Sequence, residues 1–379
     1  MIKAIFVTNI CPHYRVRTFE TLAQKMNVSF LFFSEGGERY WDARHGLQHG
    51  DFHHEYLPGF YLTRQMRITP ALVTRVWQAD VDVIIKCITG RFALPVTYLL
   101  ARARRKPFVL WTGLWSHPAT FFHHLTWPLA KYIYTHADAI VVYGAHVRNY
   151  LIKVDVQPER IFIAPHAIDS PVYNRPVPPA ERDNLRAELG LSDRRVVLYV
   201  GRLEESKGLC HLLVAGQALT DFKPVFVFVG TGALQDALVA QAKSAGLETR
   251  FLGYVPTEEL YRCYAMADVF VLPSITTATD KEPWGLVVNE AMNQALPVVA
   301  SNAVGAAAGG LIRHEETGLV FPERDVKALA TALQRIFTEP GLARRLGEAG
   351  RQEVALWTNE RMTDGFVSAA EYVLKRIGA

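Results

Sequence analysis

The sequence predicts an α/β protein made of two doubly wound domains that face a cleft, and three observations lead to that prediction. The chain has 379 residues, which is too long for one ordinary hydrophobic core. Short apolar runs alternate with helix-length segments, as in the strand–helix–strand units of a parallel sheet. A stretch with four prolines in ten residues, 170–179, separates these runs into two series and reads as an interdomain linker.

The apolar runs predict six buried parallel strands in each half. The first series is Ala4–Thr8, Val28–Phe33, Val81–Ile85, Phe108–Trp111, Ala139–Tyr143 and Ile161–Ala164. The second series is Val196–Val200, Val225–Val229, Arg250–Tyr254, Val269–Leu272, Pro297–Ala300 and Gly318–Phe321. We therefore expect Rossmann-like domains at 1–168 and 185–357, a linker at 169–184, and a final helix at about 358–379.

Charge and cysteine usage limit the compartment and the partners. The net charge of +4 is uneven: 19 Lys+Arg against 11 Asp+Glu up to Ala167 give +8, and the remaining 22 against 26 give −4. The basic half predicts an anionic partner, either a membrane surface or a phosphorylated acceptor, and no nucleic-acid module is recognisable. Four cysteines without a CxxC and no apolar run of ~18–20 residues favour a cytoplasmic protein, peripheral at the inner face of the membrane.

The stretch Lys281–Met292 carries most of the predicted chemistry. It follows a buried strand, and Pro283 suits the first turn of a helix while Gly285 admits close approach to the backbone. A helix that starts there predicts an anion site at its N-terminus. Glu282 and Glu290 place two carboxylates near that site, and an ionised carboxylate accepts hydrogen bonds from hydroxyl groups. Phosphate together with hydroxyls describes a nucleotide sugar.

A second motif follows the first strand of the second series. The turn Gly201–Gly208 carries Arg202 and Lys207 at the carboxyl end of a strand, where two cations can clamp a diphosphate. Gly230 ends the next strand and offers another point of backbone approach.

With EPWGLVVNEAM, ALPVVAS and GRLEESKG, the sequence resembles the retaining, GT-B-fold glycosyltransferases of the family 4 type (glycosyltransferases group 1). The spacing from Glu282 to Glu290 matches the signature of that family. The resemblance implies that Arg202 and Lys207 hold the donor phosphates and act with Glu282, which binds the sugar hydroxyls, and that the final helix crosses back onto the first domain. It further implies donor contacts at Glu290 (to the ribose), Gly285, Leu286, Val287, Gly230 and Val255 (to the base).

The acceptor is expected on the first domain. His13, Arg15 and Arg17 occupy the loop after the first strand, where many relatives carry a glycine pair, and His117 is the nearest match to a histidine that the family places near the reacting sugar. The arginines can grip an acceptor phosphate, or they are ordinary helix-surface charges. The segment from Ser34 to Gly59 is expected to be a solvated acceptor loop.

The resemblance implies retaining transfer of a sugar from a UDP or GDP sugar to a glycan or lipid-linked acceptor, in cell-surface polysaccharide or glycolipid synthesis. No metal and no cofactor are expected. Two alternatives remain open: a sugar-nucleotide epimerase or phosphorylase on the same fold, and a non-catalytic nucleotide- or glycan-binding protein.

Overall fold

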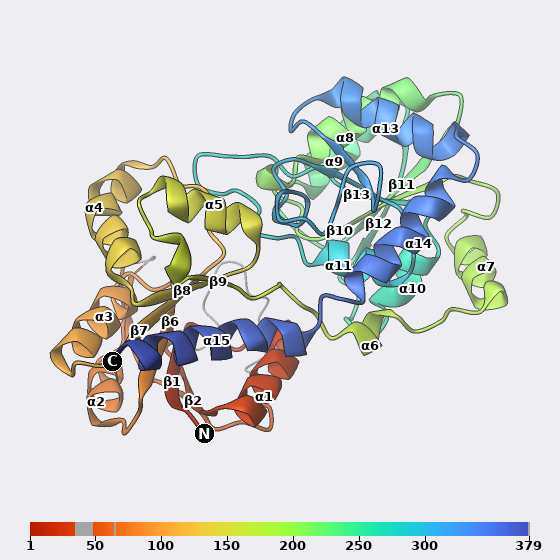
Figure 1. Cartoon of the computed structure of the whole chain (residues 1–379). Helices are drawn as coiled ribbons and strands as arrows, with labels where there is room; N and C mark the ends of the chain where they lie inside the picture. Colours follow the sequence, from red (N-terminus) through yellow and green to blue (C-terminus); the bar gives the residue numbers. More distant parts are fainter. Residues whose placement is uncertain (35–47, 64–65, 378–379) are drawn as a thin grey trace. The chain divides into compact units, whose positions relative to one another are not determined.

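The computed structural model describes residues 1–34, 48–63 and 66–377, which fold into two compact α/β units (Figure 1). Unit 1 is Met1–Trp115, Phe121–Ile168 and Thr358–Ala379, and unit 2 is Ser116–Thr120 and Asp169–Trp357. Each unit contains a wholly parallel sheet, so the α/β class is confirmed. Among the described helices, none combines the length and the apolar composition that crossing a membrane requires.

Unit 1 is built on a seven-stranded sheet in the order β3-β2-β1-β6-β7-β8-β9. Its strands are β1 (Lys3–Thr8), β2 (Asn27–Phe32), β3 (His54–Tyr56), β6 (Val83–Cys87), β7 (Phe108–Thr112), β8 (Ala139–Val142) and β9 (Ile161–Ile163). A separate antiparallel pair is formed by β4 (Phe60–Thr63) and β5 (Met66–Ile68). The helices of unit 1 are η1 (His13–Arg15), α1 (Val16–Lys25), α2 (Ala71–Gln78), α3 (Ala93–Ala103), α4 (Phe121–His136), α5 (Ala145–Lys153), η3 (Pro158–Arg160) and α15 (Asn359–Ile377).

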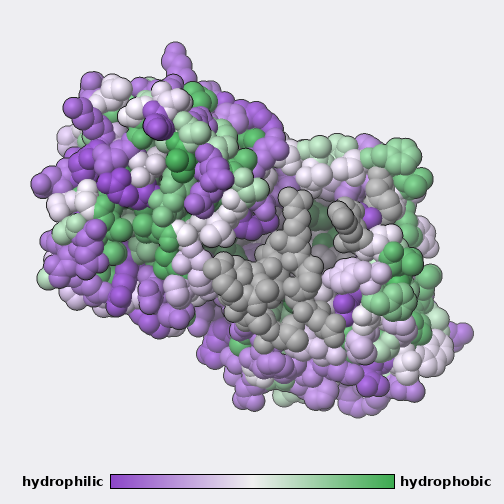
Figure 2. All heavy atoms as spheres, turned by 180° about the vertical axis from the view of Figure 1, so that it is seen from behind, coloured by the Kyte–Doolittle hydropathy of each residue, from purple (hydrophilic) through white to green (hydrophobic). Residues whose placement is uncertain are grey.

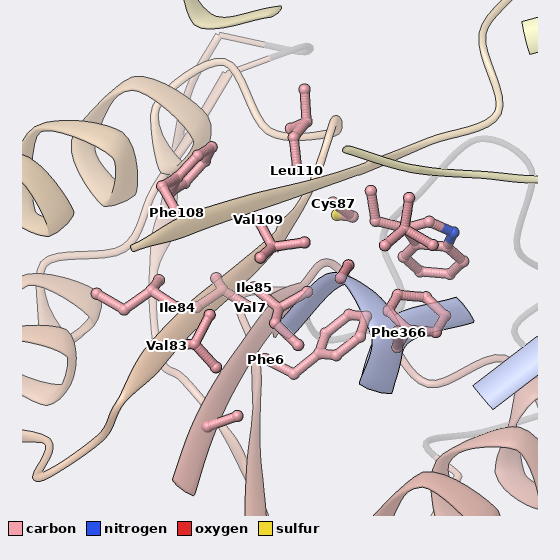
Figure 3. Close-up of a cluster of buried hydrophobic side chains, with 14 of the residues drawn as sticks. Phe6, Val7, Val83, Ile84, Ile85, Cys87, Phe108, Val109, Leu110 and Phe366 are labelled. Carbon is pink, nitrogen blue, oxygen red and sulfur yellow. The ribbon is translucent and has the colours of Figure 1, made fainter. Parts of the chain in front are cut away.

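The core of unit 1 explains why the end of the chain belongs to it. Figure 3 shows apolar side chains of β1, β6 and β7 meeting in one cluster, which Phe366 of α15 joins. The ring of Phe366 lies 5.5 Å from that of Phe6 and 5.6 Å from that of Trp111, centroid to centroid. Burying an aromatic side chain of this size contributes about 2–3 kcal/mol, so α15 is held to unit 1 by its packing.

Unit 2 is built on a six-stranded sheet in the order β12-β11-β10-β13-β14-β15. Its strands are β10 (Val196–Val200), β11 (Val225–Val229), β12 (Glu248–Gly253), β13 (Val269–Leu272), β14 (Val298–Ser301) and β15 (Leu319–Phe321). Its helices are α6 (Ser170–Tyr173), α7 (Pro179–Glu188), η4 (Glu205–Lys207), α8 (Leu209–Gly216), η5 (Gln217–Leu219), α9 (Gln235–Ser244), α10 (Leu260–Ala265), α11 (Val287–Asn293), α12 (Gly305–Ala308), α13 (Val326–Thr338) and α14 (Leu342–Val354).

The strand orders locate a switch point in each sheet. In unit 2 successive strands run outward from β10 in one direction and from β13 in the other, so β10 and β13 are neighbours whose loops diverge. In unit 1 the same reversal separates β1 from β6. Doubly wound sheets bind ligands outside the carboxyl ends of the strands at this point, because the diverging loops leave a crevice there.

Three details differ from the sequence expectations. Strand β6 begins at Val83 rather than Val81, because Asp80 and Asp82 bind the ammonium and the backbone N–H of Lys3 (2.6 and 2.9 Å). The expected linker 169–184 contains α6 and the start of α7. Within the expected acceptor loop, residues 35–47 lie outside the described part of the chain, and β3 adds a parallel strand beside β2.

Candidate functional site

Lys207 and Glu282 form an ion pair at the switch point of unit 2. The Lys207 ammonium donates to Glu282 Oε2, which also accepts a hydrogen bond from the Ser274 hydroxyl (3.2 Å). The two side chains are only 13% and 11% exposed. A pair this well shielded from water has a strong Coulombic attraction, and each partner becomes costly if the other is removed.

The backbone after β10 and β13 brings this pair together. Gly208, the last residue before α8, has a φ of +66°, and a Cβ there would lie 2.0 Å from the carbonyl oxygen of Pro273. Only glycine allows so close an approach. The Ile275 N–H donates to the carbonyl of Ser206 (2.8 Å) and fixes the two loops side by side. Residues 75 positions apart thereby meet in one site.

Arg202 lies in the same loop but has a different environment. Its side chain is 41% exposed and its guanidinium donates to Glu204 Oε1 (2.7 Å). An ion pair that faces solvent is weak, commonly below about 1 kcal/mol, so Arg202 can exchange Glu204 for another anion at small cost. Lys207 and Arg202 therefore offer one shielded and one solvent-facing cation.

The helix after Glu282 begins later than the sequence predicts. Pro283 is not in its first turn: α11 starts at Val287, with Leu286 as its N-cap, because Gly285 has a φ of +88° and breaks the approach to the helix. Any residue with a side chain would be strained at this φ, and its Cβ would lie 2.7 Å from the Leu272 side chain. Glu290 consequently sits in the first turn of α11 rather than two turns inside it.

Glu290 is a buried carboxylate held by phenol groups. It is 8% exposed, and its Oε2 accepts a hydrogen bond from the Tyr264 hydroxyl (2.6 Å). Burial raises the pKa of Glu290 to about 7, and the hydrogen bonds from Tyr264 and Tyr173 offset only part of that rise. Burial also raises the pKa values of both tyrosines, so they remain neutral donors. Glu290 thus titrates near neutral pH.

The remaining donor-side residues lie along the same edge of the sheet. Gly230, with a φ of +124°, follows β11, and a Cβ there would lie 2.1 Å from the carbonyl oxygen of Gly201. Its N–H donates to the carbonyl of Gly253 at the end of β12 (2.7 Å). Val255 follows two residues later and is partly exposed. The ends of β10, β11 and β12 are therefore tied backbone to backbone.

In the part of the chain that the structure describes, no group of three or more His, Cys, Asp or Glu side chains is arranged to hold a metal ion.

The four acceptor-side residues named from the sequence have different positions. His13 and Arg15 belong to η1, and Arg15 is buried beside the switch point of unit 1. Arg17 lies on α1 with its side chain 51% exposed and Glu20 at 3.7 Å, so it is a helix-surface charge. His117 is in the segment Ser116–Thr120, which groups with unit 2, where the Ala119 N–H donates to the carbonyl of Ala278 (2.7 Å).

Several contributors to these sites were not identified from the sequence. Around Arg15 they are Tyr143 and His166, and around Glu290 they are Tyr264 and Tyr173. Tyr143 follows β8 directly and ends the predicted run Ala139–Tyr143, and His166 lies three residues after β9. Their position at the end of a predicted strand or just after it was therefore an available signal. The two tyrosines come from α10 and α6, and nothing in the sequence pattern connects them to Glu290.

Comparison with protein families places both halves of the chain in the same group. A model described as "Glycosyl transferases group 1" matches residues 181–353, and a model described as "Glycosyltransferase Family 4" matches residues 19–170. The curated relatives include the alpha-D-kanosaminyltransferase of Streptomyces kanamyceticus, 29% identical over 66% of each chain. Another is a GDP-mannose-dependent alpha-(1-6)-phosphatidylinositol monomannoside mannosyltransferase of Mycobacterium tuberculosis, 29% identical over 63% of this chain and 65% of that protein.

The matched segments cover between 37% and 66% of the length of the first curated relatives. Solved structures show the same fold over almost the whole chain. HepE of Anabaena in complex with UDP has a TM-score of 0.77 at 20% identity, over 97% of this chain and 99% of HepE. Sucrose-phosphate synthase of Thermosynechococcus elongatus has a TM-score of 0.73 at 22% identity, over 97% and 98% of the two chains.

Removing one partner of the Lys207–Glu282 pair should destabilise unit 2. The burial of both side chains predicts that Lys207→Met loses about 3 kcal/mol or more in the free energy of unfolding. Glu282→Gln should also be destabilising. The double variant Lys207→Met/Glu282→Gln, which leaves no buried charge, should recover most of the loss. Urea unfolding of the four proteins measures this, and additive losses in the double variant would contradict a coupled pair.

Glu290 should make stability fall as the pH rises. Its pKa of about 7 in the folded chain exceeds the ordinary 4.5, so the folded state binds the proton more tightly than the unfolded state. The resulting stabilisation is fully present below about pH 4.5 and is lost as the pH rises through 7, on the order of 3 kcal/mol in total. Urea unfolding at pH 5 and pH 7.5 should show this decrease in the wild type and a smaller one in Glu290→Gln. Identical pH dependences would refute the buried, titrating carboxylate.

Proposed function

The chain belongs to the family 4 glycosyltransferases of the GT-B fold, and we propose that it transfers a sugar from a nucleoside diphosphate sugar to an acceptor with retention of anomeric configuration. The observation that carries the proposal is the Lys207–Glu282 pair at the switch point of unit 2. A cation and a carboxylate side by side match a donor that presents phosphate oxygens next to sugar hydroxyls.

Lys207 and Arg202 are proposed to stabilise the leaving group. When the bond between the anomeric carbon and the diphosphate oxygen breaks, its electron pair stays on the diphosphate, and the two cations balance that charge in place of a metal ion. The donor phosphate then replaces Glu282 as the partner of Lys207, and Glu282 becomes available to accept a hydrogen bond from the sugar. Binding of the donor therefore frees the Glu282 carboxylate to contact the sugar.

Retention requires the new bond to form on the face that the diphosphate leaves. We propose that the acceptor oxygen bonds to the anomeric carbon on that face, while its hydroxyl proton passes to the departing diphosphate oxygen. The atoms balance without a covalent enzyme intermediate. Glu290, when ionised, is proposed to accept hydrogen bonds from the ribose, which bind donor and transition state alike. The two glutamates thus have separate roles, Glu282 in turnover and Glu290 in donor affinity.

The names of the similar proteins guide the choice of donor. HepE was solved with UDP, with UDP and glucose and with UDP-glucose, and a mannosyltransferase relative is GDP-mannose-dependent. Those relatives support a UDP or GDP sugar as the donor and a glycan or a lipid-linked glycan as the acceptor, in polysaccharide or glycolipid synthesis.

A donor panel of UDP- and GDP-sugars, incubated with and without glycan and glycolipid acceptors, tests the proposal. Release of nucleoside diphosphate should require an acceptor, persist in EDTA, and yield a product with the donor's anomeric configuration by ¹H NMR. Lys207→Met/Glu282→Gln and Arg202→Ala should lower turnover ~10²-fold or more while remaining folded. Isomerised donor would indicate an epimerase, phosphate-dependent cleavage a phosphorylase, and donor binding without turnover a binding protein.

We propose a peripheral position at the membrane from α4 rather than from the basic residues Arg102, Arg104, Arg105 and Lys106 at the end of α3. Arg102 pairs with Asp138 (2.9 Å), and Arg104 donates to the carbonyls of Val76 and Ala79 (2.6 Å each), so these arginines serve the fold. Large apolar side chains instead line one face of α4 at helical spacing, with exposed fractions of 85, 68, 49 and 49% for Phe121, Leu125, Leu129 and Tyr132.

The charge around this helix favours an anionic surface. The 55 residues from Val83 to Ala137, which include α3 and α4, contain seven Lys+Arg and no Asp or Glu. Figure 2 shows apolar patches on the surface of unit 1, on the right of that view. The apolar face of α4 lies in a stretch of sequence without acids, although Lys131 of α4 pairs with Asp155 (2.6 Å). Such a face suits the headgroup region of an anionic bilayer, where apolar burial and charge attraction add.

Vesicle sedimentation tests the α4 face. The wild type should bind vesicles that contain anionic lipid, bind neutral vesicles less, and lose affinity at high salt. Leu125→Ser/Leu129→Ser should reduce the bound fraction by ~10-fold, because each substitution removes apolar burial. Val214→Ser/Val239→Ser, which alters two exposed apolar residues of unit 2, is the matched control and should bind as the wild type does. Equal binding of both double variants would exclude α4 as the contact.

A further inference from the structure

Unit 1 contains a cavity of about 120 Å³ at its own switch point. The walls come from the loop after β1, the ends of β6, β7 and β8, and include Arg15, Cys87, Trp111 and Tyr143. Since one water occupies roughly 30 Å³ and ligand pockets commonly exceed about 300 Å³, the cavity suits one functional group of a larger molecule. None of the residues that line it is an Asp or a Glu.

Arg15 places an unneutralised charge against this cavity. It is 2% exposed, and its guanidinium donates to Met362 Sδ (3.0 Å), to the Tyr143 hydroxyl (3.3 Å) and to His166 Nε2. Among the described residues, no carboxylate lies within ion-pair distance of it. A buried cation without a counter-charge costs several kcal/mol unless something else compensates for its desolvation.

The partners of Arg15 cannot supply the missing negative charge. Burial, Arg15 itself and His146 hold the pKa of His166 well below its usual value, so the imidazole is neutral. Burial raises the pKa of Tyr143 to about 12, so its phenol is neutral as well. The guanidinium also lies over the rings of Trp111 (5.1 Å), Tyr14 (5.6 Å) and Tyr143 (5.6 Å), and these cation–π contacts offset only part of the cost.

Lys86 is a second buried basic side chain in the same sheet, and burial lowers its pKa although Cys87 partly opposes this effect. It is fully buried, its Nζ donates to the carbonyls of Cys87 and Thr89 (2.7 Å each), and the Cys87 thiol lies at 3.5 Å. Burial by itself would raise the pKa of Cys87, but the nearby Lys86 ammonium and hydrogen bonds hold it below its ordinary value. Lys86 therefore has a thiol beside it that can carry the opposite charge, whereas the hydrogen-bond partners of Arg15 are neutral, although the same Cys87 thiol also lines the cavity.

Trp111 adds an independent observation. It lines the cavity at 7% exposure, and its indole Nε1 is buried without a hydrogen-bond partner among the described residues. An indole N–H only donates, and a buried donor left unpaired costs about 1–3 kcal/mol. The wall of the cavity thus includes an unneutralised guanidinium and a tryptophan whose N–H is unpaired, and no Asp or Glu.

We propose that this cavity is an oxyanion subsite, and that the acceptor carries a phosphoryl or carboxylate group that docks on Arg15 and the Trp111 N–H. The inference rests on the proposed function, because it names the chemical class of the acceptor. A group with two or more oxygens can take one hydrogen bond from each donor, and it provides the charge that Arg15 lacks.

Binding of inorganic phosphate and of acetate, at constant ionic strength, is the direct test, with methanol as the uncharged probe. Isothermal titration should show saturable binding of at least one anion to the wild type, and the anion that binds more tightly identifies the phosphoryl or the carboxylate as the natural group.

Arg15→Gln should weaken that binding ~10-fold or more, and Arg15→Lys should weaken it less. Trp111→Phe, which keeps a ring for stacking, should weaken it ~5-fold, measured at a temperature where the variant is folded. Lys153→Gln, an exposed charge on α5, should change nothing.

If Arg15→Gln fails to fold, anion binding to Trp111→Phe tests the subsite instead, because this substitution removes one hydrogen-bond donor and no charge. Absence of saturable anion binding to the wild type, or equal binding to wild type and Trp111→Phe, would overturn the subsite and leave Arg15 as a structural tie to α15. Sugar transfer to uncharged acceptors that neither phosphate nor acetate inhibits would also overturn the subsite, while the proposed transfer would stand. Anion binding with no transfer to any acceptor would keep the subsite and refute the transfer.

Discussion

The organisation of unit 2 depends on a backbone contact that only glycine permits. Gly208 approaches the carbonyl of Pro273 so closely that no side chain fits, and this contact holds the loop after β10 against the loop after β13. The loops belong to neighbouring strands at the point where the sheet reverses direction. Lys207 and Glu282 are therefore within reach of each other before any ligand arrives. Both side chains are largely shielded from solvent, so the Lys207 ammonium lies in a nearly water-free position where Glu282 neutralises its charge. A diphosphate can then exchange for the carboxylate at a low net cost.

The buried charges of the two units have different surroundings, and this difference matches the donor proposed for unit 2 and the acceptor proposed for unit 1. Unit 2 neutralises its shielded lysine with a carboxylate and keeps a second acid, Glu290, near its titration point. Unit 1 buries Arg15 among a thioether, a phenol and a neutral imidazole, and places no acid on the adjacent cavity. The first arrangement suits a ligand that brings both phosphates and hydroxyls. The second suits a ligand that brings a negative charge of its own.

Much of the fold follows from the sequence, since parallel strands buried on both faces are continuous apolar runs such as Val196–Val200 and Val225–Val229. The ends of elements were less predictable. Pro283 indicated a helix start that Gly285 prevents, because a left-handed glycine overrides the preference of a nearby proline. For the candidate site, the sequence predicted the motif residues that follow strands, but it did not predict the side chains that contact them. Tyr264 and Tyr173 reach Glu290 from separate helices, and the burial that isolates Arg15 depends on α15, more than three hundred residues away. Only the three-dimensional packing shows such pairs.

The central claim is that Lys207 passes from Glu282 to the donor diphosphate. A crystal structure of the chain with a bound nucleoside diphosphate tests it directly. A phosphate oxygen should lie at about 2.7–2.9 Å from Lys207 Nζ, the usual length of a charge-assisted hydrogen bond, with the Lys207–Glu282 distance increased and Arg202 turned from Glu204 toward the diphosphate. A diphosphate bound elsewhere on unit 2, with the Lys207–Glu282 and Arg202–Glu204 pairs unchanged, would contradict it.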